Sequence, residues 1–237
     1  MADSPVYSAL AFDVLHTLVD DSGFPRHILW RFMEESGEQV NLDHYFRQYD
    51  ALGRELFDWP SIHPFVPIRE LHRRRIRRLY SDYGVVRNVE KDLDRLWEFM
   101  GTSKLYPDVP EILPQLANHF RLALLSNADR DDPLIRKLMG LGYRFEVILT
   151  SEELGCYKPC RAIFDALLSK LELPAERVLL VGDSPQADIV GAHRAGMPVA
   201  WLNRRRQKLP PGTPKPTYEF FSLTELWKFL QSAMTKD

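Results

Sequence analysis

The spacing of apolar residues divides the chain into two kinds of segment. Between residues 25 and 100, apolar positions recur at helical spacing and no stretch reads as a strand. After residue 101, short apolar runs alternate with amphipathic segments of about 10–15 residues, the pattern of β-α units in a parallel sheet. Expected helices are 25–35, 42–57, 67–83 and 89–100 in the first part and 109–119, 132–140, 159–171, 187–195 and 223–234 in the second. Expected strands are 9–12, 121–125, 145–149, 176–181 and 198–202.

The helical part separates the first apolar run, residues 9–12, from the other expected strands. Four amphipathic helices joined by short loops suggest a small bundle. We therefore expect an α/β protein in two parts. A core domain, residues 1–20 and 102–237, carries the parallel sheet, and a four-helix domain, residues 21–101, is inserted after the first strand.

The composition adds few constraints. The chain has 237 residues, a net charge of -2, 45% hydrophobic residues and 27% charged residues, which are ordinary values for a globular protein. We expect no nucleic-acid or membrane partner, because the net charge is small and no run is apolar enough to span a bilayer. The start of the chain lacks the pattern of a signal peptide, and Cys156 and Cys160 have neither redox nor zinc spacing, so we expect a cytoplasmic protein. Whether it is a monomer or a homodimer stays open.

Polar residues follow the ends of several expected strands. Because the carboxyl ends of parallel strands meet at one edge of a sheet, these side chains are expected to share a pocket. Carboxylates that lie close together repel one another and need a cation to stay ionised, and oxygen ligands suit Mg²⁺. Lys158 supplies one positive charge. The residues concerned are Asp13, Thr17, Ser126, Asn127, Lys158, Asp183 and Asp188.

The same residues form four motifs that closely resemble those of the haloacid dehalogenase superfamily of hydrolases, and the resemblance covers nearly the whole chain. The resemblance implies a Rossmann-like core with a helical cap, of the C1 type, inserted after the first strand. The motifs, in order, are Phe12-Asp13-x-x-x-Thr17, Leu125-Ser126-Asn127, Lys158-Pro159 and Gly182-Asp183-Ser184-x-x-x-Asp188.

The resemblance also implies a role for each motif residue. Asp13 would be a nucleophile that attacks phosphorus or carbon and forms a covalent intermediate. Thr17 and Ser126 would hydrogen-bond the nucleophile or the transferring group, Asn127 stands beside Ser126 in the same motif, and Lys158 would hold the nucleophile and the substrate charge. Mg²⁺ would be held by Asp13, the backbone carbonyl of Leu15, Asp183 and Asp188, directly or through water.

Leu15 departs from the phosphatases of the superfamily, which usually carry a second Asp at this position as general acid. General acid catalysis is typically worth about 10²–10⁴-fold. The leucine therefore points either to a leaving group that needs no proton, such as halide, an activated phenolate or an acyl phosphate, or to another acid such as the neighbouring His16. The 2-haloacid dehalogenases of the superfamily also lack the second Asp.

The last motif instead favours a phosphatase that uses a metal ion. Asp183 stands where the 2-haloacid dehalogenases of the superfamily, which work without metal, carry a Ser. A third carboxylate is costly to keep ionised unless a cation is bound. We therefore expect a Mg²⁺-dependent phosphatase acting on a small phosphomonoester or activated phosphate. The alternatives are a metal-independent (S)-2-haloacid dehalogenase that displaces halide, and a non-catalytic interaction protein on the same scaffold.

The helix at 67–83 is rich in arginine, and most of that charge is expected to form a solvated face. Arg75 is the exception, because it shares an apolar stripe with Leu71 and Leu79. It could point toward the core and bind an anionic small molecule with two hydrogen bonds. Arg26, close after the nucleophile loop, and His16 are the other candidate substrate-binding residues.

Overall fold

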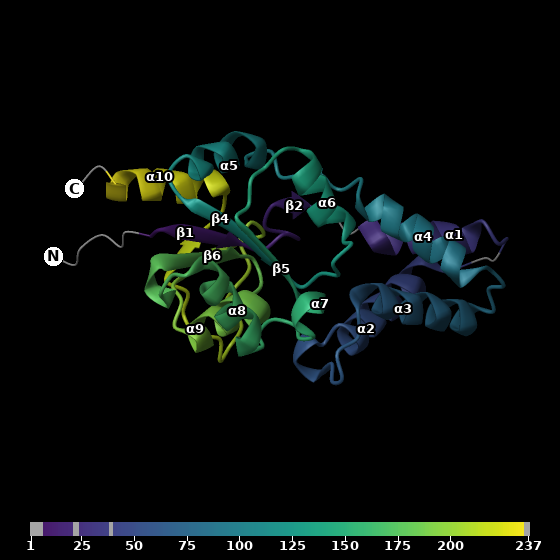
Figure 1. Cartoon of the computed structure of the whole chain (residues 1–237). Coiled ribbons are helices and arrows are strands. Elements are labelled where there is room, and N and C mark those ends of the chain that lie inside the picture. The colour runs from purple at the N-terminus through teal and green to yellow at the C-terminus, as the bar shows by residue number, and fades with distance from the viewer. Residues whose placement is uncertain (1–6, 21–23, 38–39, 235–237) are drawn as a thin grey trace.

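The chain folds into a sheet flanked by helices, with a bundle of helices at one end of the sheet (Figure 1). This arrangement is seen in a computed structural model that describes residues 7–20, 24–37 and 40–234. The Rossmann-like α/β fold with an inserted four-helix block is thereby confirmed.

The sheet has six strands in the order β5-β4-β1-β6-β7-β8, and every neighbouring pair is parallel. β1, the first strand of the chain, lies in the middle, hydrogen-bonded to β4 and β6. The strands are β1 (Ala9–Phe12), β4 (Arg121–Ser126), β5 (Val147–Thr150), β6 (Val178–Gly182), β7 (Val199–Leu202) and β8 (Tyr218–Phe220).

Both faces of the sheet are buried, which explains why its strands are continuous apolar runs rather than alternating ones. On β1, Leu10 and Phe12 point to one face and Ala9 and Ala11 to the other. The first face is covered by α5 (Val109–Ala117), α6 (Pro133–Gly140) and α10 (Leu223–Met234), and the second by α8 (Arg161–Leu171) and α9 (Val190–Ala195) (Figure 1).

The inserted block packs its four helices around a hydrophobic cluster of its own. Its helices are α1 (Phe24–Glu34), α2 (Leu42–Leu56), α3 (Ile68–Tyr83) and α4 (Val89–Met100), with a short turn η1 (Trp59–Ser61) between α2 and α3. Asn41 and Asn88 cap α2 and α4 through their side chains, and Gly84 ends α3 in a left-handed conformation. These boundaries agree with the sequence prediction to within a residue or two.

The block is joined to the sheet through a small antiparallel ribbon that the sequence did not predict. β2 (Val19–Asp20) precedes the block, β3 (Lys104–Leu105) follows it, and the two strands pair. The chain therefore enters and leaves the block side by side. The predicted domain boundaries lie just inside this ribbon, the first of them against residues 21–23, which are outside the described part, so the division into two domains stays a prediction.

Four shorter elements were also missed or assigned wrongly. Residues 187–195, expected to form one helix, are divided between a π-helical turn, η3 (Pro185–Ile189), and α9. The helical turn α7 (Ser151–Leu154) and the edge strand β8 were not predicted, and a single turn, η2 (Ala175–Arg177), leads into β6. Among the described residues, no helix combines the length and the apolar character needed to cross a bilayer, and the expected cytoplasmic location stays a prediction.

Candidate active site

The sheet topology places a crevice beside the first motif. The chain runs from β1 to β4 and β5 on one side and to β6 and β7 on the other, so the order reverses between β1 and β6. The loops that follow these two strands diverge, and in open α/β sheets ligands bind at that point, outside the carboxyl ends of the strands. Asp13 directly follows β1 and Asp183 directly follows β6.

Lys158 ties two of the three expected carboxylates together. Its Nζ donates to Asp13 Oδ1 at 2.7 Å, to Asp188 Oδ1 at 2.7 Å and to the carbonyl of Leu125 at 2.9 Å. These bonds use all three ammonium protons, and only 1% of the residue is exposed. Burial lowers the pKa of Lys158, but the charges of Asp13 and Asp188 outweigh that effect, so its pKa is raised and it stays cationic.

Asp188 is held by the turn that carries it. Its Oδ2 accepts from the backbone N–H of Ser184 at 2.9 Å, and the Ser184 side chain caps the π-helical turn. Single π-helical turns are frequent at functional sites. Gly182 makes this packing possible, because a Cβ at that position would collide with the Asp188 carboxylate.

Thr17 and Asn127 support the site from two other loops. The Thr17 hydroxyl donates to Asp13 Oδ2 at 3.2 Å. Asn127 accepts from the backbone N–H of Lys158 at 2.8 Å and donates to its carbonyl at 3.4 Å. Asn127 thus holds the loop that presents Lys158, which makes it a positioning residue. Ser126, at the end of β4, is buried.

The donor set at this edge fits a hard divalent cation. Asp13, Asp183 and Asp188 each offer a carboxylate oxygen, and these oxygens all lie within 4.8 Å of one another. Burial raises the pKa of Asp183 well above its usual range, and the charges of Asp13 and Asp188 raise it further. Burial also raises the pKa of Asp188, although Lys158 opposes the shift. One ammonium does not neutralise three carboxylates, and all-oxygen sites suit Mg²⁺. The carbonyl of Leu15 as a further ligand stays a prediction.

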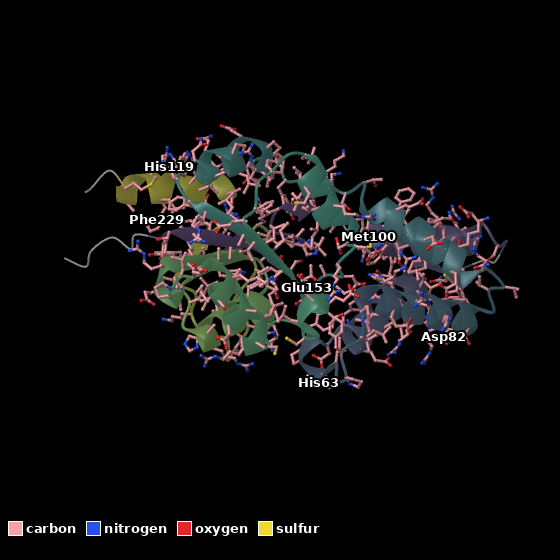
Figure 2. All side chains as sticks on the ribbon, viewed as in Figure 1. His63, Asp82, Met100, His119, Glu153 and Phe229 are labelled. Carbon is pink, nitrogen blue, oxygen red and sulfur yellow. The ribbon has the colours of Figure 1, made fainter. Side chains whose placement is uncertain are left out.

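A cavity of about 250 Å³ is lined by residues of both the core and the helical block, and it lies next to Val14, which follows Asp13. From the core it is also lined by Leu15, Ser126, Asn127 and Asp132. Met100, at the end of α4, also lines it, and Figure 2 shows this residue at the junction of the two parts, far from Asp82 at the outer end of the block.

Among the described residues, Asp132 is the only one with a carboxyl group that lines this cavity, and the sequence analysis did not include it among the site residues. Its Oδ1 accepts from the backbone N–H groups of Leu134 and Ile135 at the start of α6. Burial raises its pKa to about 6, and the charges of Asp129 and Asp131 add to the shift. In the sequence, Asp132-Pro133 indicated only the start of a helix, with Asp132 as its cap.

The helical block contributes Tyr49, Phe57, His72 and Arg75 to the cavity. Arg75 therefore lies at the pocket, where the sequence predicted it. Arg26 is not among the lining residues, and its guanidinium instead lies 4.5 Å from the centre of the Phe46 ring.

His16 and a second, larger hollow both lie apart from this cavity. His16 borders a smaller cavity next to Asp183, where its Nδ1 is 2.9 Å from an Arg205 guanidinium nitrogen. The larger hollow, about 890 Å³, lies near Ser8 and Glu146 at the amino-terminal edge of the sheet and contains none of the predicted residues.

Known proteins resemble the chain along most of its length. The family described as haloacid dehalogenase-like hydrolase matches residues 7–196. A glyceraldehyde 3-phosphate phosphatase of Methanopyrus kandleri is 35% identical over 203 residues, covering 83% of this chain and 84% of that protein. The magnesium-bound structure of YfnB from Bacillus subtilis has a TM-score of 0.78 at 25% identity, covering 95% of this chain and 99% of that one. A 2-haloacid dehalogenase of Pseudomonas syringae has a TM-score of 0.70 at 26% identity, with the same coverage.

Proposed function

The chain belongs to the haloacid dehalogenase-like hydrolases, and on that basis we propose that it is a Mg²⁺-dependent phosphohydrolase with Asp13 as nucleophile. The substrate is a small phosphomonoester or an activated phosphate. The observation that carries this proposal is the cluster of three carboxylates, Asp13, Asp183 and Asp188, around a single ammonium.

The charge of this cluster favours phosphate chemistry over metal-free displacement of halide. Without a cation, the ionised carboxylates would leave a net negative charge where an anionic substrate has to approach. Asp183 adds to that charge and makes no hydrogen bond to Lys158. A divalent ion held there makes the site attractive to a phosphate group, and it supplies Lewis-acid stabilisation of the phosphoryl oxygens when bound.

The first step falls to Asp13 and the residues that hold it. One carboxylate oxygen of Asp13 attacks phosphorus in line with the leaving oxygen, and an aspartyl phosphate forms. Lys158 and Thr17 hold the nucleophile through 2.7 Å and 3.2 Å hydrogen bonds. Because the three donors of Lys158 are occupied, it acts on the substrate through its charge, while Ser126, which lines the cavity, donates to the transferring group.

Asp132 takes the acid role that Leu15 lacks. It lines the same cavity as Leu15, and a pKa of about 6 keeps part of the population protonated near neutral pH. Its proton passes to the oxygen of the departing alcohol as the bond to phosphorus breaks. In the second step the Asp132 carboxylate takes a proton from the water that attacks the aspartyl phosphate, which releases phosphate and restores Asp13.

A 2-haloacid dehalogenase is the second candidate, and Leu15 is the observation that favours it. Halide leaves without a proton, so an apolar side chain at this position costs that reaction nothing. The solved structures similar to this chain include such dehalogenases.

One pair of assays separates the two reactions. Phosphate release from an aryl phosphate is measured with Mg²⁺ and with a chelator, beside halide release from an (S)-2-haloacid. We expect phosphate release that needs Mg²⁺ and is lost in Asp13→Asn. Halide release that a chelator leaves unchanged would reject the phosphohydrolase. No phosphate release and no halide release would favour a binding protein without catalytic activity.

A further inference from the structure

Arg75 is a buried cation without a counter-charge. It lies in the middle of α3, and only 6% of the residue is exposed. Other arginines of this helix pair with carboxylates, Arg73 and Arg74 with Glu70, Arg77 with Glu90 and Arg78 with Asp82. Among the described side chains, none forms an ion pair with Arg75, and its Nε is buried with no acceptor.

The position of Arg75 is fixed by aromatic rings. Its guanidinium carbon lies 4.2 Å from the centre of the Tyr49 ring and 4.4 Å from that of Phe57. Stacking of this kind stabilises a guanidinium and covers its faces. The N–H groups at its edge are left to bind an acceptor, and a planar or tetrahedral anion fits that edge with two hydrogen bonds.

Neither His72 nor Asp132, which line the cavity with Arg75, neutralises its charge. His72 borders the same cavity, and burial, together with Arg75, lowers its pKa to about 3, so it stays neutral. Asp132 is in the lining too, but its Oδ1 caps α6 and no ion pair joins it to Arg75. Burying an uncompensated charge is costly and buried charges are usually paired, so the unpaired guanidinium favours an anionic partner that comes from outside the chain.

The cavity is shared by Arg75 and by residues close to Asp13 in the fold. Leu15, two residues after Asp13, and Ser126, at the end of the neighbouring strand β4, line it from the core, and Arg75 lines it from the helical block. Its volume of about 250 Å³ equals that of about eight water molecules, which is below the usual range for drug-sized ligands. Leu15, Phe57 and Met100 make much of the wall apolar.

We propose that the substrate is a short phosphate ester with a second anionic group, which Arg75 binds at the far side of the cavity from Asp13. The second group is a carboxylate or a second phosphate, and a short carbon chain between the two anions lies against the apolar wall. This inference rests on the proposed function and narrows its substrate class.

Matched esters test the proposal directly. Phosphoglycolate and ethyl phosphate share a two-carbon chain, and only the first carries a carboxylate, while ethylene glycol bisphosphate carries a second phosphate. We expect kcat/KM to be roughly 10–100-fold higher for at least one doubly anionic ester than for ethyl phosphate. Which one is preferred identifies the second group.

Three variants assign that preference to Arg75. In Arg75→Met the ratio of kcat/KM for the doubly anionic ester to that for ethyl phosphate should fall close to one. Gly53→Ala should lower it several-fold, because the added methyl would lie 2.8 Å from a terminal nitrogen of Arg75. Arg77→Met, on the same helix with 60% of its side chain exposed, should leave it unchanged.

The possible results separate this inference from the proposed function. Hydrolysis of all three esters at similar efficiency by the wild type, or a preference that survives in Arg75→Met, would overturn the inference and leave the phosphohydrolase intact. If no ester is hydrolysed, calorimetry with phosphoglycolate decides. Binding that is lost in Arg75→Met supports the anion site without the reaction, and equal binding by both proteins overturns it.

Discussion

In the proposed reaction, Asp132 supplies the proton that phosphatases of this family usually donate from the position of Leu15. Leu15 lies two residues after Asp13, and its side chain cannot donate a proton. Asp132, at the start of α6, lines the same cavity and has a burial-raised pKa of about 6. The leaving-group behaviour of the enzyme should therefore depend on Asp132.

Replacing Asp132 by Asn removes the acid and leaves a side chain of the same size. We expect kcat/KM for alkyl phosphates, whose alkoxide is a poor leaving group, to fall by about 10²-fold or more, with a much smaller effect on kcat/KM for nitrophenyl phosphate, because kcat/KM reports only the steps up to release of the alcohol. In the wild type, kcat/KM for alkyl phosphates should decline as pH rises above about 6, and the variant should lose that decline. Parallel pH profiles for the two substrate types measure both effects.

Stability serves as the control for that variant. The folded-state pKa of Asp132 is raised, so its contribution is fully present below the unfolded pKa of 3.8 and is lost as pH rises through about 6. Asn caps helices as well as Asp does. At neutral pH the Asn variant should thus unfold at the same denaturant concentration as the wild type or a higher one. A marked loss of stability in this variant would show that Asp132 acts only as a helix cap.

Leu15→Asp tests whether an acid at position 15 can also protonate the leaving group. It should raise alkyl phosphate turnover more than aryl phosphate turnover, because only the alkyl leaving group needs a proton. In the Asp132→Asn background it should restore much of the lost alkyl activity. Equal gains for both substrate types would show that the leaving-group argument is wrong.

Most of the nucleophile cluster could be predicted at this scale, and Asp132 could not. Asp13, Ser126 and Asp183 each follow an apolar run, so strand periodicity alone gathers them at one edge of a sheet. Lys158 lies in a loop, so only the motif pattern predicted that it belongs to the site. Asp132 follows Ser126 by six positions, in a loop. It lines the same cavity as Leu15 because the helical block packs next to the core, and that packing joins residues far apart in the chain.

Among the helices, α3 depends on the core for its N-terminal cap. Pro67 precedes this helix and provides no side-chain cap. Asp129 of the core, three residues after Ser126, instead accepts from the backbone N–H of Ile68 at 2.7 Å and from that of Arg69 at 2.8 Å. A carboxylate at a helix N-terminus also meets the positive end of the helix dipole. The loop that follows Ser126 is thereby tied to the helix that carries Arg75.

Asp129→Ala should loosen that connection. Two backbone donors lose their acceptor, which should cost about 1–2 kcal/mol, and Asp129→Asn should cost less because one acceptor oxygen remains. We expect faster hydrogen exchange at the amides of Ile68 and Arg69 and a higher KM with a smaller change in kcat. Unchanged exchange at these two amides would show that the cap does not hold α3.

A second bond between the parts comes from the neighbour of Lys158. The Tyr157 hydroxyl donates to the carbonyl of Val66 at 2.6 Å, and its ring packs against Phe65. The sequence predicted α3 itself from its apolar stripe, because helical periodicity is local. It could not predict these bonds or the β2–β3 ribbon, because each joins residues far apart in the chain and the ribbon strands have two residues each.

For the whole molecule, the proposed binding of Mg²⁺ by the carboxylate cluster would link metal binding to folding. An ion that binds only the folded chain at about a hundred times its Kd adds about 2.7 kcal/mol, which for a chain of this size raises Tm by about 5–10 °C. We expect Mg²⁺ to produce such a shift in differential scanning fluorimetry. Asp183→Asn should lose most of it.

The same variant provides its own control in the absence of metal. Because burial and two neighbouring charges raise the pKa of Asp183, removing this carboxylate should leave the metal-free protein as stable as the wild type or more stable. An Mg²⁺ response that is undiminished in Asp183→Asn would place the ion elsewhere.

In the proposed reaction, Asp13 attacks phosphorus and is then released by water. The most direct measurement is the stereochemistry of the reaction at phosphorus, followed with an ester made chiral by oxygen isotopes and an acceptor alcohol in place of water. Each in-line displacement inverts the configuration. Two successive displacements through Asp13 predict retention, whereas inversion would show a single direct transfer and contradict the account.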